Sequence, residues 1–290
     1  MALPQPRQPR SQPSIEAAVK VKVATYNIHK GVTGIRRRPR IHEVRRAIHG
    51  IDADIVFLQE VQDRNERLVR HASYPGGTQL EFLATSVYEH RAYGMNVVYP
   101  HGHHGNAILS RHTIGHFTNH DVSDLALERR GMLHAVAHVE AAAGGTRDVH
   151  LICVHLSLIH RSRQRQASFL IDFVRHEIPP AAPLIVAGDF NDWRRRVDEL
   201  LRGRLGLSEV AIEVPGEREP RSVLDRVLPW RNARDAQARV ARTYPSFAPW
   251  FALDRIYVRG FGVLSTHVPK GIAWARRSDH APLIAELEMR

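Results

Sequence analysis

Short apolar runs recur along the chain, separated by segments rich in charge, proline and glycine. Some runs alternate apolar with polar residues, as in "MLHAVAHVE", and others are continuous, as in "LIVA". Alternation is typical of a strand with one covered face, and a continuous run is typical of a strand covered on both faces. We therefore expect strands at residues 21–26, 55–58, 107–109, 133–139, 149–156, 184–187, 255–258 and 283–287.

Two segments between these runs have apolar residues at helical spacing. This spacing puts the apolar side chains on one face of a helix, so we predict helices at residues 41–48 and 166–173. Strands and helices mixed in this way over 290 residues fit an α/β (α+β) fold, in which packed sheets have helices on their outer sides.

No repeat or strong linker divides the chain, so we expect one folded domain over residues 20–290. Residues 1–19 are rich in proline and arginine and lack the apolar stretch of a signal peptide, which predicts a disordered arm. Residues 203–244 lack a strand pattern and are expected to form a helix and loops. No apolar stretch approaches the roughly 18 residues of a membrane span. We expect a cytoplasmic protein, with peripheral contact to a membrane left open.

The formal net charge of +11 and the pI near 10.4 favour an anionic partner. A positive electrostatic field of this kind attracts nucleic acid, an acidic phospholipid surface or a phosphorylated small molecule. The alternative is that the charge only serves solubility. The single cysteine, Cys153, lies in the apolar run "VHLICVHL" and is expected to be a small buried side chain rather than a nucleophile. We expect a monomeric or weakly associating protein.

Polar residues gather at the ends of the predicted strands. Function on open sheets is usually found at strand ends, and these side chains would converge if the ends share one rim. Taken singly, each has an ordinary interpretation, such as a solvated glutamate, a core histidine or an Asx-turn in "DFND". The residues concerned are Asn27, Glu60, His155, Asp189, Asn191, Asp254, Asp279 and His280.

Together these residues supply hard oxygen ligands, amides, two histidines and a carboxylate able to orient one histidine. Magnesium prefers oxygen ligands and keeps several waters, so few protein carboxylates suffice. An aspartate bonded to a histidine holds the imidazole in one tautomer and raises its basicity. The inventory therefore suits metal-assisted attack of water on a phosphate ester. Acyl transfer and P-loop nucleotide binding fit poorly, because G-x-S-x-G and G-x-x-x-x-G-K-[ST] are absent.

Seven segments, "TYNIHKG", "LQEV", "GNAILSR", "VHLSLIHRSRQRQ", "GDFND", "LDRIYV" and "SDHAPL", stand in the order and spacing of the endonuclease/exonuclease/phosphatase superfamily. The chain resembles this group, which includes pancreatic-type deoxyribonuclease, exonuclease III-type nucleases and neutral sphingomyelinases, and is most similar to compact bacterial members. The resemblance implies a four-layer sandwich of two packed mixed sheets flanked by helices. It also implies phosphodiesterase chemistry with Mg²⁺, for which Mn²⁺ could substitute.

By motif position, Glu60 resembles the principal metal ligand of this superfamily, with Asn27 and Asp279 nearby. Asp189 and Asn191 resemble the pair that orients the attacking water and the phosphoryl oxygens.

His280 resembles the catalytic histidine of the superfamily, Asp254 its carboxylate partner, and His155 a second histidine that donates to a non-bridging oxygen. Some relatives pair that second histidine with an acid, but residues 92–110 contain none. We expect His155 to pair with an amide such as Asn96 or to stay unpaired.

Several further residues are candidates for binding substrate. Arginine clusters lie within a few residues of the proposed catalytic segments and would attract phosphates, although a charge run is usually a solvated face. The "HGHHGN" segment could bind a transition metal or reach substrate phosphate, and aromatic residues in "TYPSFAPWF" could stack on a base, enter a lipid headgroup layer or simply cap the core. The candidates are Arg111 (with a structural salt bridge as its alternative), His29, Lys30, Asn106, Arg163 and Trp250.

Three functions remain open from the sequence. The first is a metal-dependent phosphodiesterase acting on nucleic acid, which the charge and the resemblance favour. The second is a phosphoesterase acting on a phospholipid headgroup or a small phosphorylated molecule. The third is a non-catalytic adaptor for nucleic acid or a membrane surface, which would bind without turnover.

Overall fold

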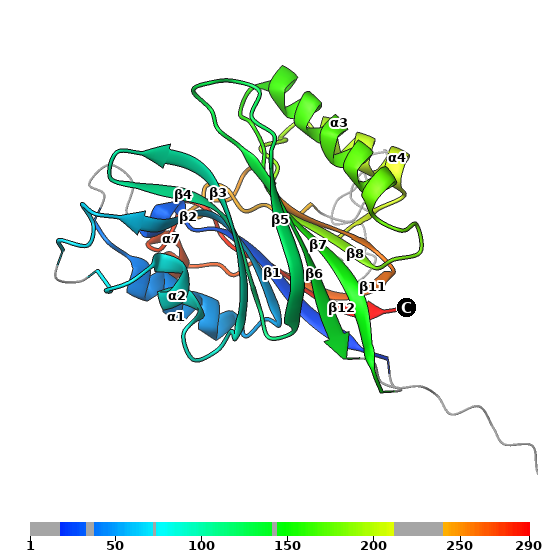
Figure 1. Ribbon diagram of the computed structural model, residues 1–290, viewed down its shortest axis with the longest axis horizontal. Coiled ribbons are helices and arrows are strands. Elements are labelled where there is room, and N and C mark those ends of the chain that lie inside the picture. Colours follow the sequence, from blue (N-terminus) through cyan, green and yellow to red (C-terminus); the bar gives the residue numbers. More distant parts are fainter. Residues whose placement is uncertain (1–17, 33–37, 72–73, 141–143, 212–239) are drawn as a thin grey trace, which may run out of the picture.

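The computed structural model describes residues 18–32, 38–71, 74–140, 144–211 and 240–290, and Figure 1 shows two β-sheets packed face to face. The first sheet has the strand order β11-β12-β1-β2-β4-β3. In that order the strands are Phe261–His267, Leu283–Met289, Lys20–Asn27, Ile55–Asn65, Gly102–Ser110 and His90–Tyr99.

The second sheet has the order β5-β6-β7-β8-β10-β9. Its strands in that order are Thr113–Asp121, Gly131–Glu140, Thr146–His155, Leu184–Asp189, Asp254–Arg259 and Ser208–Glu209.

Helices cover the outer side of each sheet (Figure 1). Within the described residues, none of them is long and apolar enough to cross a membrane. The first sheet carries α1 (Ile41–Ile51), α2 (Gln79–Ala84) and α7 (Ile272–Ala275), and the second carries α3 (His160–Glu177) and α4 (Arg196–Leu205).

Three apolar layers separate the four layers of structure, and strand alternation explains them. In β1, Val21 and Val23 point into the core between the sheets, whereas Ala24 and Tyr26 pack toward α1 and α2. Successive side chains of a strand face opposite sides, so a strand with apolar residues on both sides joins two cores at once. A third core lies between the second sheet and α3 with α4. The expected four-layer sandwich is confirmed.

Each sheet has one parallel strand pair near its centre, β1 with β2 and β7 with β8, and its other pairs are antiparallel. A parallel pair needs a crossover connection, which α1 supplies in the first sheet and α3 in the second. Asn27, the last residue of β1, is paired with Gln59 of β2, and His155, the last residue of β7, is paired with Asp189, the last of β8. Since β2 continues to Asn65, the floor of the site described below is formed by the ends of β1, β7 and β8 and by the middle of β2.

Seven of the eight strands expected from the sequence lie inside observed strands, and the eighth extends one residue past β7. The sequence missed β3, β5, β9 and β11, which stand at or next to sheet edges. Edge strands bury few side chains, as the largely exposed β5 illustrates, so they carry little apolar signal. Both predicted helices form but are longer, and α2, α4 and α7 were not anticipated.

Two expectations fall wholly or largely outside the described residues. The arm at residues 1–19 is described only at residues 18–19, which lead into β1. Within residues 203–244, the described parts hold the end of α4 and the short strand β9. Residues 212–239 are not described. Cys153 lies fully buried between the sheets, where burial raises the pKa of its thiol to about 12.

Candidate active site

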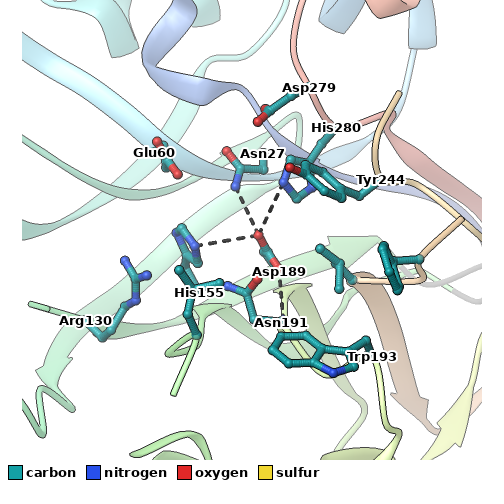
Figure 2. Close-up of a pocket in the computed structure, with 13 residues that line it drawn as sticks. Asn27, Glu60, Arg130, His155, Asp189, Asn191, Trp193, Tyr244, Asp279 and His280 are labelled. Carbon is teal, nitrogen blue, oxygen red and sulfur yellow. Dashed lines mark hydrogen bonds and ion pairs between the residues drawn. The ribbon is translucent and has the colours of Figure 1, made fainter. Parts of the chain in front are cut away.

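A pocket of about 430 Å³ opens where β1, β7 and β8 end, beside the middle of β2. Figure 2 shows its polar side chains pointing inward from both sheets. The pocket is lined by Asn27, Glu60, His155, Asp189, Asn191, Asp279 and His280, together with Arg130, Leu158, Trp193, Tyr244, Phe251 and Leu253.

Strand register explains why residues far apart in the sequence meet here. His155 and Asp189 are the last residues of β7 and β8 and are direct neighbours in the parallel ladder. Asp254 begins β10, which runs antiparallel to β8, and is paired with Asp189. In the other sheet Asn27 ends β1, and the hydroxyl of Ser278 donates to the backbone oxygen of Asn27 at 2.7 Å. That bond holds the segment before β12 against the end of β1.

Asp189 lies at the centre of the polar network. One carboxylate oxygen accepts from Asn27 Nδ2 at 3.1 Å and lies 3.6 Å from His155 Nε2 and 3.7 Å from His280 Nε2 (Figure 2). The other oxygen accepts from the backbone N–H of Asn191 at 3.0 Å. Burial raises the pKa of Asp189 to about 6, against the opposing charge of His280. A carboxylate with a pKa near neutrality is suited to accept a proton from water.

The "GDFN" segment owes its shape to a glycine and an Asx-turn. A Cβ on Gly188 would stand 1.9 Å from the backbone oxygen of Val154, and its φ of +148° lies where side chains are rarely accommodated. Asn191 has a φ of +49°, and its side chain donates to the backbone oxygen of Leu156 at 2.9 Å. The turn therefore places Asn191 beside Asp189 instead of continuing the strand.

His280 is held by a carboxylate behind it. Its Nδ1 lies 2.8 Å from Asp254 Oδ2, and the same oxygen accepts from Thr243 Oγ1 at 2.5 Å. Burial alone would lower the pKa of His280, but the negative charges of Asp254 and Asp189 outweigh it and raise that pKa to about 10. The imidazole is therefore protonated at neutral pH, with Nε2 turned toward Asp189 and the pocket.

His155 has the opposite protonation. Burial first, and then the positive charge of Arg130, holds the pKa of His155 well below its usual range, so the ring is neutral. The sequence left open whether His155 pairs with an amide such as Asn96 or stays unpaired. The pairing with Asn96 does not form, and Asn96 Oδ1 instead accepts from Asn119 Nδ2 at 3.1 Å. The nearest carboxylate to His155 is Asp189, which the strand ladder places beside it. Sequence spacing could not show this neighbour, because the two residues lie on different strands.

Glu60 and Asp279 bring two carboxylates to the mouth of the pocket. Glu60 has a φ of +57° after a register shift in β2, which turns its side chain out of the ladder. Lys30 Nζ lies 3.6 Å from Glu60, and His29 Nδ1 lies 2.8 Å from Asp279. Burial would raise the pKa of Asp279, but the hydrogen bond from His29 and the charge of His280 outweigh it and lower that pKa. Both acids are partly open to solvent.

The residues able to hold a metal fall into two sets. Among the described residues, one group of three has its ligand atoms within 4.8 Å of one another, namely Asp189, Asp254 and His280. Those atoms are already engaged with each other and with neighbouring donors. Glu60 and Asp279 instead have 22% and 41% of their side chains exposed, and their ion-pair partners are the side chains of Lys30 and His29. Hard carboxylate oxygens with room for water suit Mg²⁺, so the second set fits a hydrated dication better.

The family profile described as "Endonuclease/Exonuclease/phosphatase family" matches residues 24–280. The chain belongs to this family. It is 39% identical over 269 residues to the protein YbhP of Escherichia coli strain K12, an alignment that covers 92% of this chain and 96% of that protein.

Solved structures of other family members share the fold. An endonuclease/exonuclease/phosphatase protein from Bacteroides vulgatus superposes with a TM-score of 0.66 at 18% identity, over 94% of this chain and all of that one. The human Nocturnin catalytic domain with bound sulfate gives 0.62 at 17% identity, over 97% and 100% of the two chains. TDP2 from Danio rerio, complexed with a single-stranded DNA product, gives 0.60 at 16% identity, over 92% and 98%.

None of the six candidates for substrate binding lines the active-site pocket, and four of them lie away from it. Arg111 forms ion pairs with Asp52 and Asp54, which agrees with the alternative prediction that it makes a structural salt bridge. The side chain of Asn106 is buried and donates to the backbone oxygen of Gly131 at 2.9 Å.

The other two are Arg163 and Trp250. Arg163 is buried and donates to the backbone oxygens of Ser157 and Leu158, which makes it a support for the pocket wall. Trp250 is 70% exposed outside the pocket. His29 and Lys30 stand immediately beside the pocket through Asp279 and Glu60.

Sequence reasoning missed Arg130, which lines the pocket beside His155 (Figure 2). It lies in "LERRG", between predicted strands and outside every motif. Tyr244 was visible only as part of "TYPSFAPWF", and Trp193 only as the residue that follows "GDFND". The ring of Tyr244 lies 4.9 Å from that of His280. The only sign in the sequence that Tyr244 belongs to the site is its place in the aromatic segment "TYPSFAPWF".

Proposed function

We propose that this protein is a divalent-metal-dependent phosphodiesterase that hydrolyses its substrate by in-line attack of water. One observation carries the proposal. A carboxylate whose pKa is near neutrality, Asp189, stands between a protonated histidine and a neutral one, in a pocket that also holds two partly exposed acids, Glu60 and Asp279. Base, donors and metal ligands are the parts that phosphodiester hydrolysis needs.

The proposed roles follow from these environments. Asp189 accepts a proton from the attacking water, and Asn27 and Asn191 hold its carboxylate in position. His280 donates from Nε2 toward the phosphoryl group, with Asp254 keeping its Nδ1 occupied. His155, neutral and buried, donates a hydrogen bond to a non-bridging oxygen.

Glu60 and Asp279 would hold the metal, with Mg²⁺ as the proposed ion and Mn²⁺ as a substitute. When bound, such an ion neutralises charge on the phosphoryl oxygens and lowers the barrier to displacement. Lys30 and His29, which form ion pairs with these two acids, would supply further donors for the phosphate.

Nucleic acid is the proposed substrate. The net charge of +11 favours a polyanion, and the similar TDP2 structure holds a single-stranded DNA product. The test is hydrolysis of single- and double-stranded DNA and RNA with Mg²⁺ and with Mn²⁺, beside Asp189→Ala as the blank. Cleavage by the wild type alone supports the proposal. Salt-sensitive binding without turnover, unchanged in Glu60→Gln and His280→Ala, would favour the adaptor.

A phospholipid headgroup is a second candidate, because exposed apolar side chains surround the mouth of the pocket. Leu158 is 58% exposed, Phe251 48% and Trp193 46%, and all three line the pocket. Phe247 and Trp250, in the same turn as Phe251, are exposed further. Aromatic and aliphatic side chains of this kind enter the headgroup layer of a membrane.

The experiment for this second candidate offers vesicles of anionic phospholipid with Mg²⁺ and follows release of the headgroup phosphate. Trp250→Ser would weaken vesicle binding while preserving hydrolysis of a soluble diester. Hydrolysis of nucleic acid but of no lipid removes this candidate.

A further inference from the structure

A second pocket, of about 490 Å³, lies beside the active site and is lined by basic side chains. No aspartate or glutamate is among the residues that line it in the described part of the chain. Its basic residues come from the segment after β1, from the turn after β2, and from β4 with the loop before it. They are Lys30, Arg38, Arg67, His71, His101 and His104.

The two pockets meet at one ion pair. Lys30 lines the second pocket, Glu60 lines the first, and their charged atoms are 3.6 Å apart. His104 lies near the same boundary, since the charges of Lys30 and Glu60 both act on it. A ligand with one group at Asp189 can therefore extend past Glu60 into the basic pocket.

The basic pocket has unused capacity for an anion. Arg67 is exposed, and none of the described acidic residues forms a recorded ion pair with its side chain. Nearby Glu66 is taken by Arg64 at 3.0 Å, and Asp63 accepts from the backbone N–H of Leu80 at 3.0 Å. The buried Nδ1 of His104 has no hydrogen-bond partner among the described residues. The formal positive charges of this pocket are those of Lys30, Arg38 and Arg67, whereas burial lowers the pKa of His104 to about 4, so that its ring is neutral. Cations in a concave site attract phosphate more strongly than the same charges on an open face.

We propose that the basic pocket binds a second phosphate group of the substrate, next to the phosphodiester cleaved at Asp189. The preferred substrate is then a diester that carries a neighbouring phosphate, and this inference rests on the proposed function. Tyr99 belongs to the same pocket, with its ring centroid 5.3 Å from that of His101 and 5.9 Å from that of His104. Aromatic surface beside cations suits a nucleotide, so a flanking nucleotide is the favoured source, and a phosphorylated lipid headgroup is the other.

The test compares ligands that differ by one phosphate. Thymidylyl-thymidine has one phosphodiester, and its 5′- or 3′-phosphorylated forms add a second phosphate. Glycerophosphoinositol and its 4-phosphate make the same comparison for a lipid headgroup. Affinities are measured by calorimetry with the full chain in chelator, and kcat/KM is measured separately with Mg²⁺.

Arg67→Ala is compared with Arg70→Ala, which removes the same charge three residues later from an exposed position that does not line the pocket. We expect the added phosphate to tighten binding about tenfold in the wild type and in Arg70→Ala. Arg67→Ala should lose most of that gain and bind the one-phosphate ligands unchanged, and Arg67→Lys should recover part of it.

The results separate the proposals. A gain in the nucleotide series supports the pocket with nucleic acid as its source, and a gain only in the inositol series supports it with a headgroup. Equal affinity for one and two phosphates in both series overturns it, as does an equal loss in Arg67→Ala and Arg70→Ala. Binding is measured without turnover, so failure of hydrolysis would remove the proposed function and leave the pocket's own result standing.

Discussion

His280 Nδ1 and Asp254 Oδ2 lie 2.8 Å apart, although 26 residues separate them in the sequence. Asp254 is fully buried and begins β10, while His280 comes from the turn before β12 in the other sheet. The pair therefore bridges the two halves of the sandwich. The carboxylate of Asp254 holds the imidazole of His280 in one orientation. Removing either residue should therefore leave the pocket without a correctly oriented imidazole.

His280→Ala should lower kcat by about a thousandfold, the usual range for loss of a positioned acid or base. Asp254→Asn should lower kcat by at least about a hundredfold, because the amide can no longer stabilise the imidazolium. Initial rates on a phosphodiester substrate measure both, and thermal melting checks that each variant folds. An Asp254→Asn enzyme with wild-type kcat would contradict the assigned pairing.

The pH profile of kcat/KM should be bell-shaped. The pKa of Asp189 is raised to about 6, so its carboxylate, and with it activity, is lost as pH falls below that value. The pKa of His280 is raised to about 10, so its donor proton is lost as pH rises through that value. Because the charge of Asp254 is a cause of the second shift, the alkaline limb of Asp254→Asn should move to lower pH. If the alkaline limb of Asp254→Asn stays at the wild-type pH, a group other than His280 is responsible for it.

Chelation should abolish activity, and Mg²⁺ or Mn²⁺ should restore it. Glu60→Gln removes a carboxylate from the proposed metal site, so it should require at least about tenfold more metal for half-maximal rate. Asn27→Ala serves as the contrast, because Asn27 Nδ2 donates to Asp189 and its loss should lower kcat more than metal affinity. Metal binding by calorimetry separates the two effects. Full activity in chelator would refute the metal requirement.

Arg163→Met should destabilise the protein by about 2–4 kcal/mol, because buried Asp192 then loses its nearest cation and two backbone oxygens lose their donor. Arg165→Ala, two residues along the same helix, breaks an exposed ion pair with Asp124 and should leave the unfolding midpoint nearly unchanged, because exposed ion pairs contribute little to stability. Urea unfolding midpoints measure the difference. Equal unfolding midpoints for the two variants would show that the buried contacts of Arg163 do not stabilise the fold.

The candidate site was predictable where a short motif carries both a strand and its polar end. In "LIVAGDFND" the apolar run, the glycine and the Asx-turn all act within a few residues, so Asp189 and Asn191 were placed without knowledge of the fold. Arg111 and Arg163 show where this reasoning failed. A long cationic side chain reaches many partners, and only packing shows that Arg111 meets Asp52 and Asp54 while Arg163 turns inward.

The sequence by itself determined the central strands, two helices and the residues that end those strands, because apolar periodicity and turn chemistry are local. Tertiary structure alone decided which ends meet, since the ladder sets His155 beside Asp189 and the packing of two sheets brings Glu60 and His280 to the same pocket. It also decided the protonation of the two histidines. Burial and neighbouring charge depend on contacts between distant segments, and those contacts exist only after the sheets have packed.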